Sequence, residues 1–424
     1  MIFKKVLSLM ITSTLCLGLL VGCGNKDTGE NSTSKGNDES FTLRISTTGE
    51  KDDNLDLAMD MFKEKYPNAE FEIISSPWNA TREKQITLMS MGDIPDICKT
   101  GGWAKEFYND GLAMNLTDVI KDWDIYNKLT PGQLERMKFG DDICAVTYNT
   151  NTMYMFYNKK LLEKLGVEVP KTIADLETLG KKIKESGTKT EDGKNVYAAN
   201  ISTGSVWDIS TWAFSLGADF MNKDYTKTLI DLPESIAAHT KMQEFVKNGW
   251  APIPDGTSDQ LWFNGQLATY ITGEWTIPAT LDAKIDVGYA PAPAGSTGLS
   301  VAPIGGCDWV ITEQSKNKEK AIEFLKLMYS EEFQVKADRG VTDLSIYDNT
   351  EKQKLWEKDG VLESKKVQQE QLKTAKYIAF DGLYAFPDAQ NVYKAAVERI
   401  LVNQEDPKTV LENAANEINK GLTK

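Results

Sequence analysis

From Phe41 onward, short apolar runs alternate with segments in which apolar residues recur every three or four positions. The first part of this pattern predicts strands over residues 41–47, 69–75 and 95–99, and helices over 55–66, 82–91 and from about 104. In the first of these helices the apolar residues fall at i, i+3, i+4, i+7 and i+11, on one face, and Pro67 ends it. Helices of this length can connect parallel strands, and ligands in such sheets bind beyond the carboxyl ends of the strands.

The remainder of the chain continues the same alternation. Further strands are predicted over residues 143–148, 153–157, 197–201, 268–272, 286–289 and 308–312. Further helices are predicted over residues 158–165, 209–216, 236–245 and 321–328, from Thr172, and over most of the chain from 351. Thr172 and Asp175 have the spacing of a capping box. The whole pattern predicts an α/β fold.

The N-terminus has the pattern of an export signal. Lys4 and Lys5 precede an apolar run over 6–21, and Gly22-Cys23 follows it. This end resembles a bacterial lipobox, in which the signal is cut before the Cys and the thiol receives a diacylglycerol. Two acyl chains give stable anchoring. The alternative is a plain signal peptide with a chance cysteine.

Residues 1–22 are therefore expected to be a lipoprotein signal peptide. Residues 24–40 contain no large apolar residue and are rich in Gly, Ser, Asn and charge, so residues 23–40 are expected to form a flexible tether. No other stretch has the length of a membrane span. We expect lipidated Cys23 alone to hold the mature protein on the outer face of the cell membrane.

Composition excludes several classes of function. Lys and Arg number 48 against 62 Asp and Glu, a net charge of −14, which repels nucleic acid and anionic lipid. Cys98, Cys144 and Cys307 have neither metal nor redox spacing, and they predict no disulfide framework. His239 is the only histidine, and we interpret it as a partly buried helix residue. We expect no cofactor and no metal site.

Four segments of the chain resemble a known protein family. They are GDIPDI at 92–97 with the following Gly111, Leu112 and Leu116; YMFYNKKLLEKLGVEVPKT at 154–172; FNGQLATYITGEW at 263–275; and GGCDWVITEQSKNKEKAIEFLKLMYSEEFQ at 305–334. In this order, they resemble the extracellular solute-binding proteins that serve ABC sugar importers, a maltose- and oligosaccharide-binding type of lipoprotein. The match spans most of residues 41–400.

The resemblance implies a two-lobe periplasmic-binding-protein-like fold, each lobe a sheet flanked by helices, with a chain that crosses the hinge more than once. Lobe 1 is expected over residues 41–150 with 278–332, and lobe 2 over 151–277 with 333–424. The implied function is capture of a sugar or oligosaccharide in the interlobe cleft for import. The implied partners are membrane-bound permease subunits; the ATPase must be a separate chain, because no phosphate-binding loop motif is present. We expect a monomer.

Ten tryptophans are a high number for this length. The negative face of an indole complements the C–H groups of a pyranose ring, so stacking combines area burial with electrostatic attraction. Trp78 follows the second predicted strand, at the sheet edge where ligands bind. Trp275 lies where the resemblance places a stacking aromatic.

Three more tryptophans are candidates by position. Trp103 follows two glycines, Trp207 comes just after the predicted strand at 197–201, and Trp309 follows two glycines that would let the backbone approach a ligand. Strand alternation could instead point Trp309 into the core. The other five are expected to serve packing: Trp123, Trp212, Trp250, Trp262 and Trp356.

Sugar hydroxyls both donate and accept hydrogen bonds, so short polar side chains should accompany the aromatics. The candidates are Glu50, Asn79, Asp96, Asp208, Glu274, Asp308, Arg339 and Asp381. Asp96 has the competing role of holding a strand end, and Asp381 that of an exposed turn carboxylate.

Two other functions fit parts of the pattern. A secreted glycoside hydrolase or lyase needs two carboxylates at a fixed separation, and no acid pair stands out. The same scaffold could bind a polyamine or another polar solute, but aromatics favour a sugar over a cation. We therefore expect a binding protein and not an enzyme.

Overall fold

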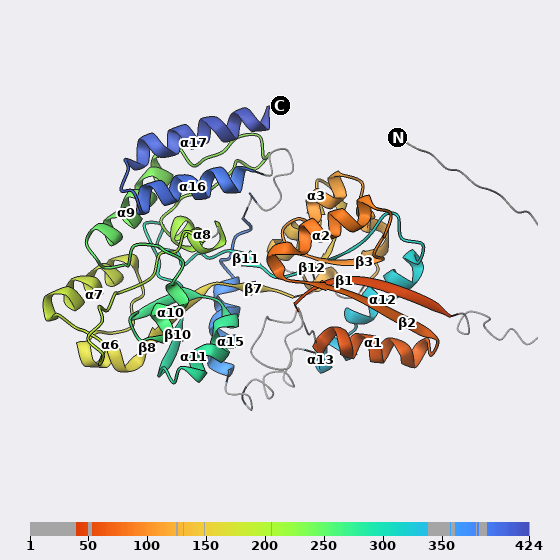
Figure 1. Ribbon diagram of the computed structural model, residues 1–424, viewed down its shortest axis with the longest axis horizontal. Coiled ribbons are helices and arrows are strands. Elements are labelled where there is room, and N and C mark those ends of the chain that lie inside the picture. Colours follow the sequence, from red (N-terminus) through yellow and green to blue (C-terminus); the bar gives the residue numbers. More distant parts are fainter. Residues whose placement is uncertain are drawn as a thin grey trace, which may run out of the picture.

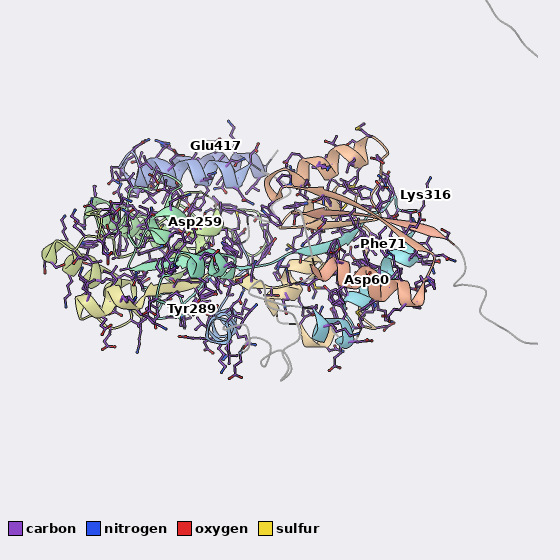
Figure 2. The ribbon with its side chains drawn as sticks, turned by 60° about the horizontal axis from the view of Figure 1, so that its bottom comes forward. Asp60, Phe71, Asp259, Tyr289, Lys316 and Glu417 are labelled. Atoms are coloured by element: carbon purple, nitrogen blue, oxygen red, sulfur yellow. The ribbon has the colours of Figure 1, made fainter. Side chains whose placement is uncertain are left out.

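The computed structural model describes residues 40–49, 53–123, 126–129, 131–147, 149–204, 206–337, 357, 361–378, 380 and 388–423. Figure 1 shows that these residues form two bodies, one on each side of strands β7 and β11. Figure 2 shows the same division in another view, with Phe71 and Asp60 in one body and Tyr289 and Asp259 in the other. We call the body with Phe71 lobe 1 and the body with Tyr289 lobe 2.

Lobe 1 is built on a five-stranded sheet with the order β2-β1-β3-β12-β6. Its strands are β1 (Phe41–Thr48), β2 (Ala69–Ser76), β3 (Ile97–Thr100), β6 (Val146–Thr147) and β12 (Asp308–Ile311). β1 pairs in parallel with β2 and β3, while β12 runs antiparallel to both β3 and β6. The parallel start agrees with the predicted strand–helix alternation. The distant β12 inserts between strands of the first 150 residues, so the chain returns to lobe 1.

Helices cover both faces of this sheet (Figure 1). The helices of lobe 1 are α1 (Asp53–Lys65), α2 (Trp78–Ser90), α3 (Ala104–Asn109), α4 (Thr117–Ile120), η1 (Tyr126–Lys128), α5 (Pro131–Met137), α12 (Lys318–Met328) and α13 (Glu331–Lys336). A small hairpin of β4 (Lys138–Phe139) and β5 (Asp142–Ile143) accompanies them. On one face, Phe62 of α1 packs edge-to-face with Phe324 of α12 at 5.3 Å between ring centroids.

Lobe 2 contains a three-stranded antiparallel sheet with the order β10-β8-β9. Its strands are β8 (Tyr154–Asn158), β9 (Thr269–Thr272) and β10 (Val287–Ala290). Its helices are α6 (Lys159–Leu165), α7 (Ile173–Ser186), α8 (Val206–Ser215), α9 (Pro233–Lys247), α10 (Ser258–Phe263), η2 (Glu274–Thr276), α11 (Ile277–Asp282), α15 (Leu362–Leu372), α16 (Ala389–Leu401) and α17 (Pro407–Leu422). The predicted capping box is present at the start of α7: Thr172 accepts from the backbone of Asp175, and Asp175 accepts in return.

Two short strands lie between the lobes. β7 (Asn151–Thr152) pairs antiparallel with β11 (Ile304–Gly305), and Figure 1 shows them between the two bodies. Ile304 also donates a backbone hydrogen bond to Lys376, at 2.8 Å. Chain segments that are far apart in sequence therefore meet at this connection, which we call the hinge.

Several features differ from the sequence prediction. Residues 197–201 form no strand, because Tyr197 has a single bridge, to Leu267. β10 pairs with β8, so residues 287–290 belong to the lobe 2 sheet although the sequence placed 278–332 in lobe 1. Conversely, Phe333 packs in the core of lobe 1. We propose that residues 278–302 belong to lobe 2 and residues 333–337 to lobe 1.

Candidate functional site

Trp78 and Trp103 form a pair of indoles on lobe 1, at the carboxyl ends of β2 and β3. Trp78 is the first residue of α2 and is 53% exposed. Its ring centroid lies 5.4 Å from that of half-buried Trp103, whose Nε1 donates to Oε1 of buried Gln85 at 3.0 Å. Gly101 makes the approach possible, since an added Cβ would lie 2.7 Å from Trp103 and 2.9 Å from Trp78. Trp78 therefore presents ring surface to solvent from an anchored base.

Trp275 is the corresponding exposed indole on lobe 2. It lies in η2, directly after β9, and is 46% exposed. Its ring lies over the backbone of Gly273, where an added Cβ would be 2.0 Å from the ring. Among the nine tryptophans that the structure describes, Trp78 and Trp275 are the two that are exposed.

Glu274, the neighbour of Trp275, points the other way. It is 1% exposed, and its Oε2 accepts from Nε2 of Gln368 on α15 at 2.7 Å. Its charge also contributes, after burial, to raising the pKa of Tyr154. This carboxylate serves the interior of lobe 2, so we leave it out of the proposed site.

Trp207 lies at the hinge. It is the second residue of α8 and is half-buried. An added Cβ on Gly305 would be 2.2 Å from its ring, so the indole covers the backbone of β11. The glycine that the sequence analysis associated with Trp309 therefore accommodates Trp207 instead.

Asp308 and Trp309 are both buried on β12. Trp309 is 0% exposed and packs in the core of lobe 1, on a strand that lies between β3 and β6. Asp308 accepts from Arg136 Nη2 at 2.8 Å and from Thr147 Oγ1 at 3.0 Å. Burial raises the pKa of Asp308, and the charge of Arg136 opposes part of that shift. The ligand-facing roles predicted for both residues do not fit these positions, and we leave both out of the proposed site.

Arg136, the ion-pair partner of Asp308, also contacts the hinge. It is 4% exposed and donates to the backbone oxygens of Gly305 and Gly306, the latter at 2.9 Å. Gly306 has φ +123, and an added Cβ there would be 2.1 Å from the Asn149 oxygen. The glycine pair thus lets lobe 1 hold the hinge strand closely.

Side chains also make contact directly between the lobes. The Tyr225 hydroxyl of lobe 2 donates to Glu135 Oε1 of α5 at 3.2 Å. The Lys105 Nζ of α3 lies 4.3 Å from the ring centroid of Tyr377 and 5.9 Å from that of Tyr225. None of these residues was predicted from the sequence to belong to the site. One available signal was a lysine in the first turn of a helix, where the helix dipole disfavours a cation.

The other polar candidates are placed as follows. Asp96 holds the end of β3, because it accepts from the Arg44 backbone at 2.9 Å and from Ser315 Oγ at 2.6 Å. Asp208 accepts from Ser202 Oγ at 3.2 Å, near Trp207 on α8. Asn79 is in α2. The side chain of Asn79 lies outside the described residues, as do Cys23, Glu50, Arg339, Asp381 and Trp356.

His239, Cys98 and Cys144 are buried, and Cys307 is half-buried. His239 of α9 is 0% exposed; its Nδ1 pairs with the Ser235 carbonyl at 2.6 Å and its Nε2 with the Tyr393 hydroxyl at 2.7 Å. Burial lowers its pKa to about 4, so it is neutral near pH 7. Burial raises the pKa of Cys144 to about 12, which makes it a poor nucleophile. No metal-like cluster of His, Cys, Asp or Glu occurs in the part of the chain that the structure describes.

Comparison with known proteins now identifies the family. The model of the bacterial extracellular solute-binding protein family matches residues 48–335. The chain belongs to this family. The family consists of binding proteins and not of enzymes, as the sequence predicted. Within the described residues of this solute-binding protein, no helix has the length and apolarity of a membrane span.

Two curated relatives of this solute-binding protein are informative. A binding protein of Brucella abortus is 28% identical over 281 residues, which are 63% of this chain and 65% of that protein. The match thus spans just under two thirds of the relative's length. A maltooligosaccharide ABC transporter solute-binding lipoprotein of Streptococcus pneumoniae is 25% identical over 369 residues, 78% of each chain.

A solved structure confirms the two-lobe fold. The sugar-binding protein MalE of Xanthomonas citri superposes with a TM-score of 0.78, at 18% identity, over 90% of this chain and 98% of that one. At this identity the likeness shows the fold of the solute-binding protein alone.

Proposed function

We propose that this solute-binding protein captures a sugar or oligosaccharide between its lobes and delivers it to the permease of an ABC importer. The observation that carries the proposal is the exposure of Trp78 (53%) and Trp275 (46%), one on each lobe. An exposed indole offers a large apolar face with a polar edge, which suits a recognition surface that is partly apolar and partly wet. Indole rings favour flat, C–H-lined ligands such as pyranoses over small cations that need carboxylates.

Trp103 and Trp207 complete the proposed site. Trp103 supports Trp78 on lobe 1, and Trp207 covers the hinge strand next to Asp208. Asn79 remains a proposed polar contact because it follows Trp78 in α2. The pneumococcal relative, whose name states maltooligosaccharide, supports a sugar ligand.

The proposed mechanism is closure of the two lobes around the ligand. A ligand that touches Trp78 and Trp275 gains both contacts only when the lobes approach, so binding shifts the population toward the closed form. The permease would then recognise the closed form. Small-angle scattering with and without sugar measures this directly: we expect a smaller radius of gyration with sugar, and an unchanged radius would contradict closure.

Titration calorimetry against mono- and oligosaccharides tests the ligand class. With the sugar that binds, Trp275→Ala should weaken binding by about thirtyfold, because a buried aromatic anchor contributes about 2 kcal/mol. Leu281→Ala is the matched control, since Leu281 is a 51% exposed apolar residue on the neighbouring α11. Equal affinities of the two variants would remove Trp275 from the site. No binding across the panel, with binding of a polyamine, would replace the sugar assignment.

We further propose that the mature protein is a monomer anchored to the outer face of the cell membrane by a diacylglyceryl group on Cys23. The lipobox-like residues 20–23 and the name of the pneumococcal lipoprotein support this. Metabolic labelling with a palmitate analogue should mark the wild-type chain and not Cys23→Ser, which should be released from membranes. Light scattering of the released chain should give the mass of one copy.

A further inference from the structure

Lys105 holds a buried positive charge between the two lobes. Lys105 is the second residue of α3 and is 5% exposed. Two tyrosine rings from lobe 2 lie against its ammonium: the ring centroids of Tyr377 and Tyr225 are 4.3 Å and 5.9 Å from Lys105 Nζ. Among the described residues its ammonium has no hydrogen-bond acceptor and no ion-pair partner within contact distance. An ammonium has three donors, so this is an incomplete set of contacts.

Its position connects the two parts of the proposed site. Trp103, which supports Trp78, is the N-cap of the same helix. Tyr377 follows Lys376, whose backbone hydrogen-bonds Ala302 and Ile304 beside the hinge strand covered by Trp207. The Lys105 ammonium therefore lies between the lobe 1 indole pair and the hinge.

The surrounding charges argue for an uncharged ligand group. Glu135 and Asp308 attract the ammonium, and Arg136 repels it, so two cations face two carboxylates. Asp308 is already paired with Arg136, and Glu135 accepts from Tyr225. Burial lowers the pKa of Lys105, because the charged form loses solvation at this 5% exposed position. The missing contribution is an acceptor oxygen, not a net negative charge.

We infer that Lys105 is a specificity-determining residue of the proposed site, whose ammonium donates hydrogen bonds to a hydroxyl or ether oxygen of a neutral sugar held between the lobes. This inference rests on the proposed function and deepens it. Approach of Tyr225 and Tyr377 without ligand buries the ammonium without an acceptor, which is unfavourable. A ligand oxygen supplies the acceptor, so Lys105 makes closure depend on the ligand.

The test compares the wild-type chain with Lys105→Met, which keeps the length and packing of the side chain without its donors. Lys63→Met is the matched control, because exposed Lys63 lies over the Phe71 ring at 5.6 Å, away from the hinge. We expect Lys105→Met to weaken binding of the neutral sugar by about tenfold or more, as loss of a charge-assisted hydrogen bond does. Lys63→Met should bind as the wild type does.

Scattering of the ligand-free proteins separates this inference from its alternative. If the ammonium opposes closure, ligand-free Lys105→Met has a radius of gyration equal to or smaller than that of the wild type. A larger radius of gyration would mean that Lys105 only holds the two lobes together through its contacts with the tyrosine rings, and it would overturn the inference. Unchanged sugar affinity, or wild-type preference for an acidic over a neutral sugar that Lys105→Met loses, would also overturn it. Failure of the wild type to bind any sugar would instead reject the proposed function.

Discussion

The two lobes support their exposed tryptophans in different ways. On lobe 1, Trp78 leans on Trp103, which is fixed by a hydrogen bond to buried Gln85. On lobe 2, the Trp275 ring lies directly on the backbone of Gly273. A side-chain support can adjust by rotating, whereas a backbone support cannot, so the lobe 2 ring should be the more sensitive of the two to a change beneath it.

The lobes also bury their polar groups differently. Lobe 1 encloses the ion pair of Arg136 and Asp308 beside the hinge, while lobe 2 encloses the neutral pair of His239 and Tyr393. Removing one partner of a buried ion pair leaves the other charge without compensation. A buried neutral imidazole is destabilised when it is protonated. The stability contributed by the Arg136–Asp308 pair should therefore be sensitive to mutation, and that of the His239–Tyr393 pair to pH.

The largest expected effect is on the lobe 1 pair. Asp308→Asn leaves the Arg136 charge buried without its counter-charge, and we expect a loss of about 3–5 kcal/mol in the free energy of unfolding. Urea denaturation measures it. Asp192→Asn is the control, because its partner Lys194 and Asp192 itself are on the surface. Similar midpoints for the two variants would contradict the structural role assigned to the Arg136–Asp308 pair.

The next effect is the pH response of lobe 2. Burial lowers the pKa of His239 from 6.5 to about 4, so the unfolded chain takes up the proton first as the pH falls. The contribution of His239 to the free energy of unfolding is fully present above pH 6.5 and is lost as the pH falls toward 4. In total it amounts to about 3 kcal/mol.

The histidine is the only one in the chain, which makes the control simple. Urea denaturation at several pH values should give a steeper fall for the wild type than for His239→Gln between pH 6.5 and 4. Parallel curves for the two proteins would show that His239 takes up its proton at the same pH in the folded and unfolded states, which would contradict the lowered pKa.

A smaller effect concerns the lobe 2 indole. Gly273 has φ −113 and ψ 177, an extended conformation that alanine also adopts, so Gly273→Ala acts only through the ring above it. The Cβ would displace Trp275, and we expect about tenfold weaker sugar binding with the fold retained. Calorimetry with a thermal melt measures both. Wild-type affinity would mean that the ring does not contact the ligand from its present position.

The smallest effect concerns the lobe 1 pair of indoles. Gln85→Met removes the acceptor of Trp103 and the hydrogen bonds that Gln85 donates to Ser46 Oγ and the Lys99 carbonyl, but it leaves both stacking surfaces in place. We expect about threefold weaker sugar binding, less than for Gly273→Ala, since only one of the lost hydrogen bonds anchors an indole and both rings remain. A loss larger than that of Gly273→Ala would reverse the proposed order of sensitivity between the lobes.

The sequence determined the local elements well where one signal dominated. Phe62 and its neighbours on one face of α1, the capping box at Thr172 and the strands β1, β2 and β3 all follow from spacing within a few residues. The predicted strand at 197–201 failed because a strand needs a partner with the right register. Tyr197 has only a single bridge to Leu267, about seventy residues away in the chain.

Tertiary structure alone decided which candidates reach the surface. Trp275 and Glu274 are adjacent in sequence, yet one is 46% and the other 1% exposed. Trp309 is enclosed by the core of lobe 1, which segments from distant parts of the chain build. Lys105 shows the same dependence, since the rings that bury it come from residues 225 and 377. Burial depends on neighbours that are distant in the chain, and the sequence pattern of a residue's own segment does not contain them.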